Sequence, residues 1–600
     1  MRFLKLLLAA HLAAGLSFIV VFLHYFQYPA TIAILHILLL FCGLALLLLP
    51  CLYLQSKGNG AAIHIYILLA LPAFDFVLIL IYSANIISNI IWGGNITLQL
   101  VMAYVADLGE LRKTLPALNL YLIALPIIYL LLVAGYRYLF RRYYESGSDY
   151  RLPTIRIASY STLALLASVV MLQINFDRED PGIWGGEPIS NLFLDYIPMF
   201  EYDPTLPALQ SAANPDQEGQ QPRTARQNRN IIIIMVDALR ADHLKAYGYS
   251  RDTSPFLSAL HNEGRLISVD MVHSTCSESA CGILSTLTGN EFEQIRSNTT
   301  HLGNILQANG YTSSFIVTGN HAWGGLRTMY DADYFSDGET RENYSVNDDA
   351  GIIDDLQMLD LATQQPNFLY FHLYSAHDLG LRHRQFNQFE PFKPSFNPLA
   401  TLFGSETDRH QQELNNYDNG ILQADFFIAQ IFAQLEDKGI LHNSIVYITS
   451  DHGQAFGEHG HRGHTRFLYE EHIRIPLFIY DAQIDRYQNT QYATHIDIVP
   501  TVLETLAIEP LDNLAGLSLL QPVIDNRITQ HRSTILNGWK LSLVKRGNLI
   551  YKHLWEGAAY RERTAEMLFE ITADPDESMN ILETAEGREI VELTTGMSNR

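Results

Sequence analysis

The sequence predicts a helical membrane domain followed by a soluble α/β domain. Two patterns support this prediction: the first third of the 600-residue chain holds long apolar stretches, and the later part alternates buried-strand and helix patterns. The charge divides at the same place. Residues 1–174 carry ten Lys or Arg and five Asp or Glu, a balance of +5, so the net charge of −23 leaves −28 for residues 175–600. The two parts are therefore suited to different solvents.

Five apolar stretches in the first part each approach the roughly 20 residues that an α-helix needs to cross a bilayer. They cover residues 4–26, 31–55, 61–83, 118–139 and 157–174. We predict a five-helix transmembrane domain over residues 1–174. A cleaved signal peptide is the alternative for the first stretch, but a second apolar stretch follows within a few residues. Asp75 lies inside the third stretch, where a carboxylate is costly in hydrocarbon, so we expect it to face the helix bundle or a water-filled cavity.

The charges that flank these stretches predict an orientation. Lys and Arg gather before the first stretch, between the second and third, and between the fourth and fifth: Arg2, Lys5, Lys57, Arg137, Arg141, Arg142, Arg151 and Arg156. All of them fall on the cytoplasmic side if the amino terminus is cytoplasmic, as the positive-inside rule requires. An odd number of spans then places the rest of the chain outside. We therefore expect a multi-pass protein of a bacterial inner membrane whose C-terminal domain lies in the periplasm.

Residues 175–229 are rich in Pro, Asn, Gln and Gly without sustained periodicity, which is typical of a linker. A soluble domain is expected from 230 to 600. Its first segment, NIIIIMV at 230–236, is a continuous apolar run that predicts a buried strand, and IVYIT at 445–449 repeats the pattern. Strands that alternate with helices indicate an α/β domain, whose ligands bind beyond the carboxyl ends of the strands.

Composition also limits the partners of the soluble domain. Its acidic balance and its lack of a long basic run argue against nucleic acid, because phosphate binding draws on clustered Lys and Arg. Four cysteines are too few for a disulfide scaffold, and Cys42 and Cys51 lie in or beside an apolar run where packing explains them. Cys276 and Cys281 are left, and in an oxidising compartment they could form a disulfide.

Several residues carry the types of side chain that metal-assisted ester chemistry needs. Asp237 ends the first buried strand, and Asp451 with His452 ends a later one. Carboxylate oxygens and an imidazole that converge from separate strands can hold a divalent cation. The segment STCSESACGILSTLTG at 274–289 adds a candidate nucleophile before an apparent helix. Each Asp has an alternative role as a helix cap, so the prediction of a site depends on the combination.

Five ordered segments resemble the motifs of sulfatases and their relatives in the alkaline-phosphatase superfamily. They are VDALRADHLKAYGYSRDTSPFLSALHNEG at 236–264, SDHGQAFGEHG at 450–460, LYEEHIRIPLFIY at 468–480, THIDIVPTVLETLAI at 494–508 and LFEITADPDESMNIL at 568–582. The resemblance covers residues 230–585 and implies a central mixed, mostly parallel sheet between helices.

The resemblance also implies roles for individual residues. It assigns Asp237, Asp451 and His452 as metal ligands, and Cys276 as nucleophile and further ligand. His377 and His464 fall where relatives place groups that hold the ester oxygens or protonate the leaving group. His321 and Trp323 resemble substrate-side residues of lipoteichoic acid synthase-like enzymes.

Two departures from the sulfatase pattern change the expected activity. Sulfatases usually carry two adjacent acids where this chain has Asp237 followed by Ala238, and their C-x-P-S-R element is C-S-E-S-A here, without Pro and Arg. The altered element argues against conversion of Cys276 to formylglycine. A single acid and an unmodified nucleophile resemble the phosphoethanolamine and phosphoglycerol transferases, which use a threonine, and Thr275 is adjacent. If Cys276 is bonded to Cys281, Thr275 or Ser277 becomes the candidate nucleophile.

We therefore expect a membrane-anchored, metal-dependent enzyme that transfers a phospholipid headgroup, phosphoethanolamine or phosphoglycerol, at the outer face of the inner membrane. The expected partner is a membrane lipid or lipid-linked substrate, and the expected cofactor is Zn or Mn rather than Ca. A sulfatase or phosphodiesterase is the first alternative, favoured by the DPDESMN segment at 574–580. A regulator or lipid sensor that keeps the fold without turnover is the second.

Overall fold

The computed structural model divides the chain into two compact units, Met1–Tyr196 with Ala558–Glu562, and Ile197–Gly557 with Arg563–Arg600. Each unit is described by itself. The structure describes residues 15–20, 22, 31–57, 60–92, 95–96, 98, 101, 117–144, 187–192, 228–295, 299–321, 326–361, 365–392, 406–460, 462–464, 467–509, 511, 514–525, 527–532, 539–556 and 566–597.

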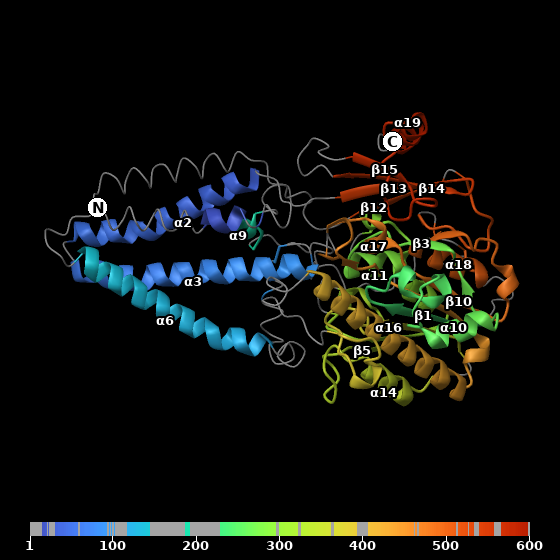
Figure 1. Cartoon of the computed structure of the whole chain (residues 1–600). Coiled ribbons are helices and arrows are strands. Elements are labelled where there is room, and N and C mark those ends of the chain that lie inside the picture. Colours follow the sequence, from blue (N-terminus) through green and yellow to red (C-terminus); the bar gives the residue numbers. More distant parts are fainter. Residues whose placement is uncertain are drawn as a thin grey trace. The chain divides into compact units, whose positions relative to one another are not determined.

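Among its described residues, the first unit contains three long apolar helices (Figure 1), which coincide with the second, third and fourth predicted stretches. They are α2 (Thr31–Ser56), α3 (Gly60–Trp92) and α6 (Ala117–Tyr144). Among the described residues one segment, Leu68–Asn89, is long and apolar enough to cross a membrane, and Thr31–Leu44 and Leu122–Tyr138 are shorter apolar helices. The first stretch is described only at 15–20 and 22, where it is helical, and the fifth lies outside the described residues. The five-helix arrangement therefore stays a prediction.

Polar side chains on α3 find partners inside the first unit. Asp75 accepts a hydrogen bond of 2.6 Å from the Tyr136 hydroxyl of α6, which confirms that it faces another helix. Asn85 donates to the carbonyl of Ile81 at 2.9 Å and accepts from the amide of Ile96 at 3.2 Å. The polar side chain of Asn85 is thus paired within the protein. For this reason α3 can continue to Trp92, beyond the apolar stretch that ends at residue 83.

The second unit is built on a seven-stranded sheet (Figure 1) with the order β2-β10-β7-β1-β6-β4-β5. Its strands are β1 (Asn230–Val236), β2 (Ile267–Ser268), β4 (Thr312–Val317), β5 (Tyr334–Ser336), β6 (Asn367–Leu373), β7 (Ser444–Thr449) and β10 (Leu477–Tyr480). Neighbouring strands are parallel from β7 to β5, whereas β10 runs antiparallel to both β7 and β2. The predicted mixed, mostly parallel sheet is confirmed.

Helices cover both faces of this sheet, so the central strands are buried on both sides. Along β1 the odd-numbered Ile231, Ile233 and Met235 pack into one core, and the even-numbered Ile232, Ile234 and Val236 pack into the other. This double burial explains why the strand is a continuous apolar run. The first core is covered by α11 (Ser279–Thr288), α12 (Leu302–Ala308) and α18 (Ile498–Thr505); the second by α10 (Pro255–Asn262), α14 (Ala350–Met358) and α16 (Glu406–Asp437).

A second, antiparallel sheet follows in the chain. It consists of β12 (Arg527–Arg532), β13 (Trp539–Arg546), β14 (Leu549–Glu556) and β15 (Glu566–Glu570), with α19 (Ala585–Met597) packed against it. Further short strands and α-helices of this unit are β3 (Met271–His273), β11 (Tyr492–Thr494), β8 (Ala455–Phe456), β9 (Arg462–Gly463), α13 (Leu326–Met329) and α17 (Glu470–Ile473).

A buried ion cluster joins this second sheet to the main part of the unit. Lys552 of β14 is fully buried, and its ammonium lies 2.9 Å from Glu577 and 3.2 Å from Glu470. Glu470 in turn lies 3.1 Å from the ring of His273. Burial raises the pKa of Glu577 to about 7, while the charge of Lys552 acts in the opposite direction. The late sequence motif thus contributes a carboxylate that holds two layers of the fold together.

Candidate active site

Three neighbouring parallel strands, β1, β6 and β7, deliver acidic and imidazole side chains to the same edge of the central sheet. Asp237 directly follows β1, Asp451 lies two residues after β7, and His372 is the second-last residue of β6. Their ligand atoms all lie within 4.8 Å of one another. Nε2 of His372 is 3.5 Å from Oδ2 of Asp237 and 4.0 Å from Oδ2 of Asp451. The two predicted aspartates meet, and sequence reasoning missed His372.

The atoms at the centre of this cluster have no hydrogen-bond partner among the described residues. They are Oδ1 of Asp237, Nε2 of His372 and Oδ2 of Asp451, all buried. Leaving a buried polar atom without a hydrogen bond costs about 1–3 kcal/mol. Three such atoms that point to one place therefore indicate a partner that they share. Burial and the charge of Asp451 raise the pKa of Asp237 well above its usual range. A divalent cation would reverse that shift and satisfy all three atoms, so the donor set fits a metal ion.

His452 adds a second imidazole to the cluster. Its Nδ1 lies 2.8 Å from the carbonyl of Gly453, a hydrogen-bond acceptor, so Nδ1 carries the proton and Nε2 presents its lone pair. Nε2 lies 3.5 Å from Oδ2 of Asp451 and 3.8 Å from Oδ1 of Asp237. The structure thus brings the three predicted ligands Asp237, Asp451 and His452 together.

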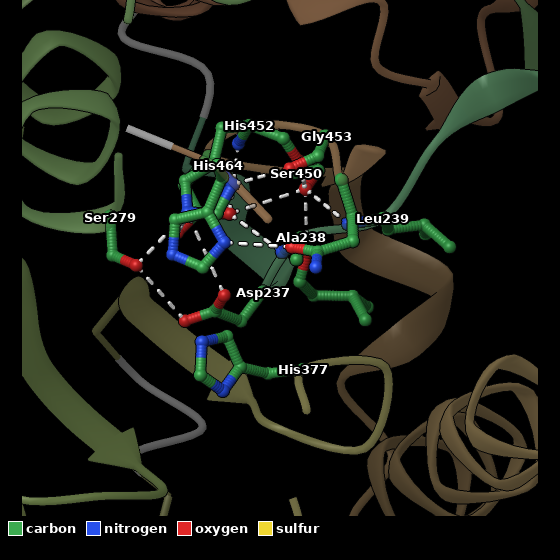
Figure 2. A network of polar contacts seen from close by, with 12 residues as sticks. Asp237, Ala238, Leu239, Ser279, His377, Ser450, His452, Gly453 and His464 are labelled. Atoms are coloured by element: carbon green, nitrogen blue, oxygen red, sulfur yellow. Dashed lines mark hydrogen bonds and ion pairs between the residues drawn. The ribbon is translucent and has the colours of Figure 1, made fainter. Parts of the chain in front are cut away.

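Ser279 presents its hydroxyl to the same cluster (Figure 2). Its Oγ lies 3.3 Å from Oδ2 of Asp237 and 3.1 Å from Nε2 of His452. Ser279 is the first residue of α11, which follows the extended residue Glu278. The helix approaches closely because Gly282 has no side chain: a Cβ there would lie 2.3 Å from the carbonyl oxygen of Asp451. The hydroxyl therefore sits at a helix amino terminus, where backbone N–H groups favour an anion.

The cysteine expected as nucleophile has another role. Cys276 forms a disulfide with Cys281, with their Cα atoms 5.9 Å apart. A sulfur in a disulfide supplies no thiolate, so the prediction of Cys276 as nucleophile and metal ligand is wrong. The bond instead cross-links the segment that leads into α11. Of the two substitutes, Thr275 places its Oγ1 2.9 Å from Nε2 of His495, and Ser277 has a buried hydroxyl without a hydrogen-bond partner among the described residues.

Two further predicted histidines lie beside the cluster (Figure 2). The ring of His464 stacks on that of His452 with centroids 4.3 Å apart, and His377 lies 5.4 Å from His464. Nδ1 of His377 accepts the amide hydrogen of Leu379 at 3.1 Å, so its proton is on Nε2. Burial lowers the pKa of His377 to about 3, and burial together with the His452 charge lowers the pKa of His464 well below its usual range. Both rings are neutral at pH 7.

His321 lies behind the cluster. Its Nε2 is 3.1 Å from Nδ1 of His372, and its Nδ1 is 2.9 Å from the hydroxyl of Tyr330. Such a chain of hydrogen bonds can fix the ring orientation of His372. Trp323, its predicted companion, lies outside the described residues.

Backbone geometry also supports the cluster. Ala238 has a φ of 60°, in the left-handed region that a residue with a Cβ rarely adopts. Its amide donates to Oδ1 of Asp451 at 3.0 Å, and the next amide, of Leu239, donates to the Ser450 hydroxyl at 2.8 Å. Such strain costs about 1–3 kcal/mol and persists where the surrounding contacts hold it. The turn after β1 therefore links Asp237 to Asp451 through the main chain.

Comparison with known proteins agrees with this geometry. The Sulfatase family model matches residues 229–508, and the model of the N-sulphoglucosamine sulphohydrolase C-terminal region matches residues 457–599.

Curated relatives fall into two groups. Kdo(2)-lipid A phosphoethanolamine 7''-transferase of Salmonella typhimurium is 23% identical over 273 residues, covering 44% of this chain and 47% of that protein. Phosphatidylethanolamine transferase Mcr-1 of Escherichia coli is 25% identical over 298 residues, covering 46% and 54%. Arylsulfatase K of Xenopus laevis is 28% identical over 171 residues, covering 26% and 32%. The chain thus spans about half or less of the length of these relatives.

Two solved structures resemble part of this chain. BT4656 in complex with D-glucosamine-2-N,6-O-disulfate has a TM-score of 0.47 at 17% identity, and the match covers 62% of this chain and 97% of that one. The C-terminal periplasmic domain of EcEptC from Escherichia coli, in complex with Zn, has a TM-score of 0.41 at 17% identity, covering 51% and 91%. The cluster of Asp237, His372 and Asp451 thus lies within the segment that matches the Sulfatase family model, and over this segment the chain is similar to enzymes of that family.

Proposed function

We propose that the protein is a membrane-anchored, metal-dependent transferase that moves a phospholipid headgroup through a covalent intermediate on Ser279. One observation carries this proposal: the Ser279 hydroxyl lies within 3.3 Å of both Asp237 and His452, at the point where three unpaired buried ligand atoms converge. An aliphatic hydroxyl is a weak nucleophile by itself and needs a base or a cation beside it. Oδ2 of Asp237 is in place to accept the proton of Ser279.

The first half of the reaction is a displacement at phosphorus. Oγ of Ser279 forms a bond to phosphorus while the bond from phosphorus to the lipid oxygen breaks, and the hydroxyl proton passes to Oδ2 of Asp237. Diacylglycerol leaves and the headgroup phosphate stays as an ester on Ser279. In the second half an acceptor hydroxyl attacks phosphorus and loses its proton to solvent, while Oγ of Ser279 leaves and takes back the proton held by Asp237, which restores the serine.

The leaving oxygen needs a proton, and His377 is placed to give it. Its Nε2 carries the hydrogen because Nδ1 accepts from Leu379, and the imidazolate that donation leaves is then reprotonated from solvent. His464 stands beside it with its Nδ1 hydrogen held by the side-chain oxygen of Gln454 at 2.7 Å. Through Nε2–H, neutral His377 can also stabilise an oxygen atom on which negative charge grows, whereas the one N–H of neutral His464 is bonded to Gln454.

The donor set favours Zn or Mn as the metal. Asp237 and Asp451 offer carboxylate oxygens, and His372 and His452 offer imidazole nitrogens. Two nitrogens among four donors suit Zn or Mn better than Ca, which prefers oxygen ligands alone. When bound, the ion supplies positive charge that lowers the pKa of the attacking hydroxyl and stabilises the phosphoryl oxygens.

Transfer is favoured over sulfate hydrolysis by the state of the cysteines. Cys276 is bonded to Cys281 and cannot be the precursor of formylglycine, and Ser279 offers an ordinary hydroxyl. Phosphoethanolamine transferases are among the relatives with the longest matched segments. A disulfide in this segment also supports an oxidising compartment, hence a periplasmic site for the domain. The apolar helices of the first unit would keep the domain near lipid substrates.

The experiment that tests the proposal uses the full chain in detergent micelles, with fluorescent phosphatidylethanolamine and phosphatidylglycerol as donors and added Zn or Mn. We expect labelled diacylglycerol to form, and Ser279→Ala to abolish it. Acid quenching followed by fragmentation mass spectrometry should find the headgroup phosphate on Ser279. If no labelled diacylglycerol forms from either lipid with metal bound, the transferase proposal is wrong, and a regulator or a sulfatase is the better hypothesis.

A sulfuric ester hydrolase is the second candidate, because residues 457–599 match the C-terminal region of N-sulphoglucosamine sulphohydrolase. The same preparation incubated with an aryl sulfate separates the two. Release of sulfate without lipid turnover would support the hydrolase.

A further inference from the structure

The rim of the candidate active site carries an acidic group that the chemistry described above does not use. Asp378 directly follows His377 and is exposed. Its Oδ2 accepts a hydrogen bond of 3.2 Å from the side-chain amide of Gln454. The other end of the same amide, its oxygen, lies 2.7 Å from Nδ1 of His464. One buried glutamine thus connects the carboxylate to the imidazoles that surround the reacting phosphate.

The negative charge of Asp378 also acts on Asp237, at the centre of the site. Its charge is among the causes that raise the pKa of Asp237, together with burial and the charge of Asp451. An additional negative charge beside a site for an anionic phosphodiester repels the substrate unless it meets a positive charge of that substrate. The position of Asp378 therefore needs a compensating cation.

The described residues supply that cation only at a distance: Asp378 forms no ion pair among them, although the charge of Arg382 acts on its carboxylate. Arg382 directs the hydrogen bonds of its guanidinium to carbonyl oxygens, at 3.0 Å to both Gly380 and His377 and at 3.3 Å to Asn416. The carboxylate is thus exposed, bonded to Gln454, and without a direct ion pair in the described part of the chain.

We propose that Asp378 is a specificity residue that binds the ammonium group of a phosphoethanolamine headgroup. The inference rests on the proposed function and names its substrate class. In phosphoethanolamine the ammonium is separated from phosphorus by one ester oxygen and two carbons, so a phosphate held at Ser279 directs the ammonium to the rim. A charge-assisted hydrogen bond from the ammonium to Asp378 then selects this headgroup over glycerol, which carries no charge. His377, the adjacent residue, donates to the leaving oxygen of the same ester.

The test compares two donors on the full chain in detergent micelles with Zn or Mn: labelled phosphatidylethanolamine and labelled phosphatidylglycerol. We expect the native protein to prefer phosphatidylethanolamine. Asp378→Asn keeps the hydrogen bond from Gln454 but removes the charge, so it should lower kcat/KM for phosphatidylethanolamine about tenfold and leave phosphatidylglycerol unchanged. Asp378→Glu should restore part of the preference. Asp485→Asn, at an exposed aspartate between β10 and β11, is the matched control and should change neither.

The outcomes separate this inference from the proposal on which it rests. If Asp378→Asn lowers both donors equally, Asp378 only orients Gln454 and His464, and the recognition of an ammonium group is wrong while the transferase stands. An unchanged ratio in a variant that still turns over has the same meaning. If the native protein releases diacylglycerol from neither lipid, the transferase itself is wrong and the inference falls with it.

Discussion

The hydroxyl of Ser279 lies 3.1 Å from Nε2 of His452, whose other nitrogen is fixed by the carbonyl of Gly453. Thr275, four residues earlier, directs its hydroxyl to His495 instead. We therefore expect Ser279→Ala to lower turnover at least about a thousandfold, as the loss of a nucleophile does, and Thr275→Ala to lower it about tenfold or less. Release of labelled diacylglycerol measures both. The reverse order of the two losses would assign the nucleophile to Thr275.

The disulfide predicts a separation of stability from activity. Cys276 and Cys281 are both fully buried and close a short loop just before and within the first turn of α11. The double variant Cys276→Ala/Cys281→Ala should lose about 2 kcal/mol of unfolding free energy through the greater entropy of its unfolded chain. Its turnover should stay within a few-fold of the native value, because neither sulfur reaches the reacting atoms. A loss of activity as large as that of Ser279→Ala, in a protein that is still folded, would contradict this view.

Thiol labelling gives an independent check of the same bond. When the protein without substitutions is denatured, two more thiols should react after reduction than before it. An equal number before and after would mean that Cys276 and Cys281 are not paired.

Part of the site could be predicted from the sequence, since it depends on where strands end. Asp237 and Asp451 follow continuous apolar runs, and parallel strands bring such ends together at one edge of a sheet. His372 was missed because it lies inside β6, and its only signal is a single imidazole in the buried run NFLYFHL. A histidine in a strand that is buried on both faces needs a partner, and that signal could have identified it.

The nucleophile could not be chosen from sequence for a different reason. Thr275, Cys276, Ser277 and Ser279 lie within five positions, and the direction of each side chain depends on the residue at which α11 begins. The Cys276–Cys281 bond and the contact of Gly282 with Asp451 set that point, and both are tertiary. In the first unit the apolar stretches predicted α2, α3 and α6 within a residue at their starts, but not the continuation of α3 to Trp92. That continuation depends on the partners of Asn85.

Gly282 offers a test of how closely α11 packs against Asp451. A Cβ there would lie 2.3 Å from the carbonyl oxygen and 2.8 Å from the carbonyl carbon of Asp451, so Gly282→Ala must displace the helix or the metal ligand. We expect a loss of about 1–3 kcal/mol in stability, together with less bound metal per purified protein. Gly135→Ala, at a helical glycine with nothing within 4 Å, is the matched control and should lose neither. Normal metal content in Gly282→Ala would argue against this close packing of α11 on Asp451.

His301 predicts an acid-sensitive step in stability. It is buried at the start of α12, where its Nδ1 accepts from the amide of Gly303 at 3.0 Å, and burial lowers its pKa from 6.5 to about 4. The unfolded chain binds a proton at pH values where the folded protein does not. The stability from the neutral ring is therefore complete above pH 6.5 and is lost as the pH falls from 6.5 to 4, by about 3 kcal/mol in all.

The variant His301→Asn keeps a capping acceptor but does not titrate. Its thermal midpoint should fall less between pH 7.5 and pH 5 than that of the native protein. The exposed His442 provides the control, and His442→Asn should behave as the native protein does. An equal fall in all three proteins would show that His301 is not the source of the acid sensitivity.

Lys552 tests the ion cluster that joins the two sheets. Its ammonium, fully buried, lies between Glu577 at 2.9 Å and Glu470 at 3.2 Å. Lys552→Met keeps the length of the side chain but leaves two buried carboxylates without their shared cation, which should cost about 3–5 kcal/mol. The triple variant Lys552→Met/Glu470→Gln/Glu577→Gln should recover much of this loss, because it removes the uncompensated charges as well.

The pH dependence of unfolding, measured at pH 7.5 and pH 5.5, tests the same cluster. Because the pKa of Glu577, already about 7, rises further when Lys552 is lost, acid should protonate it and stabilise Lys552→Met relative to the native protein. A Lys552→Met protein as stable as the native one at both pH values would mean that the cluster does not hold the second sheet in place.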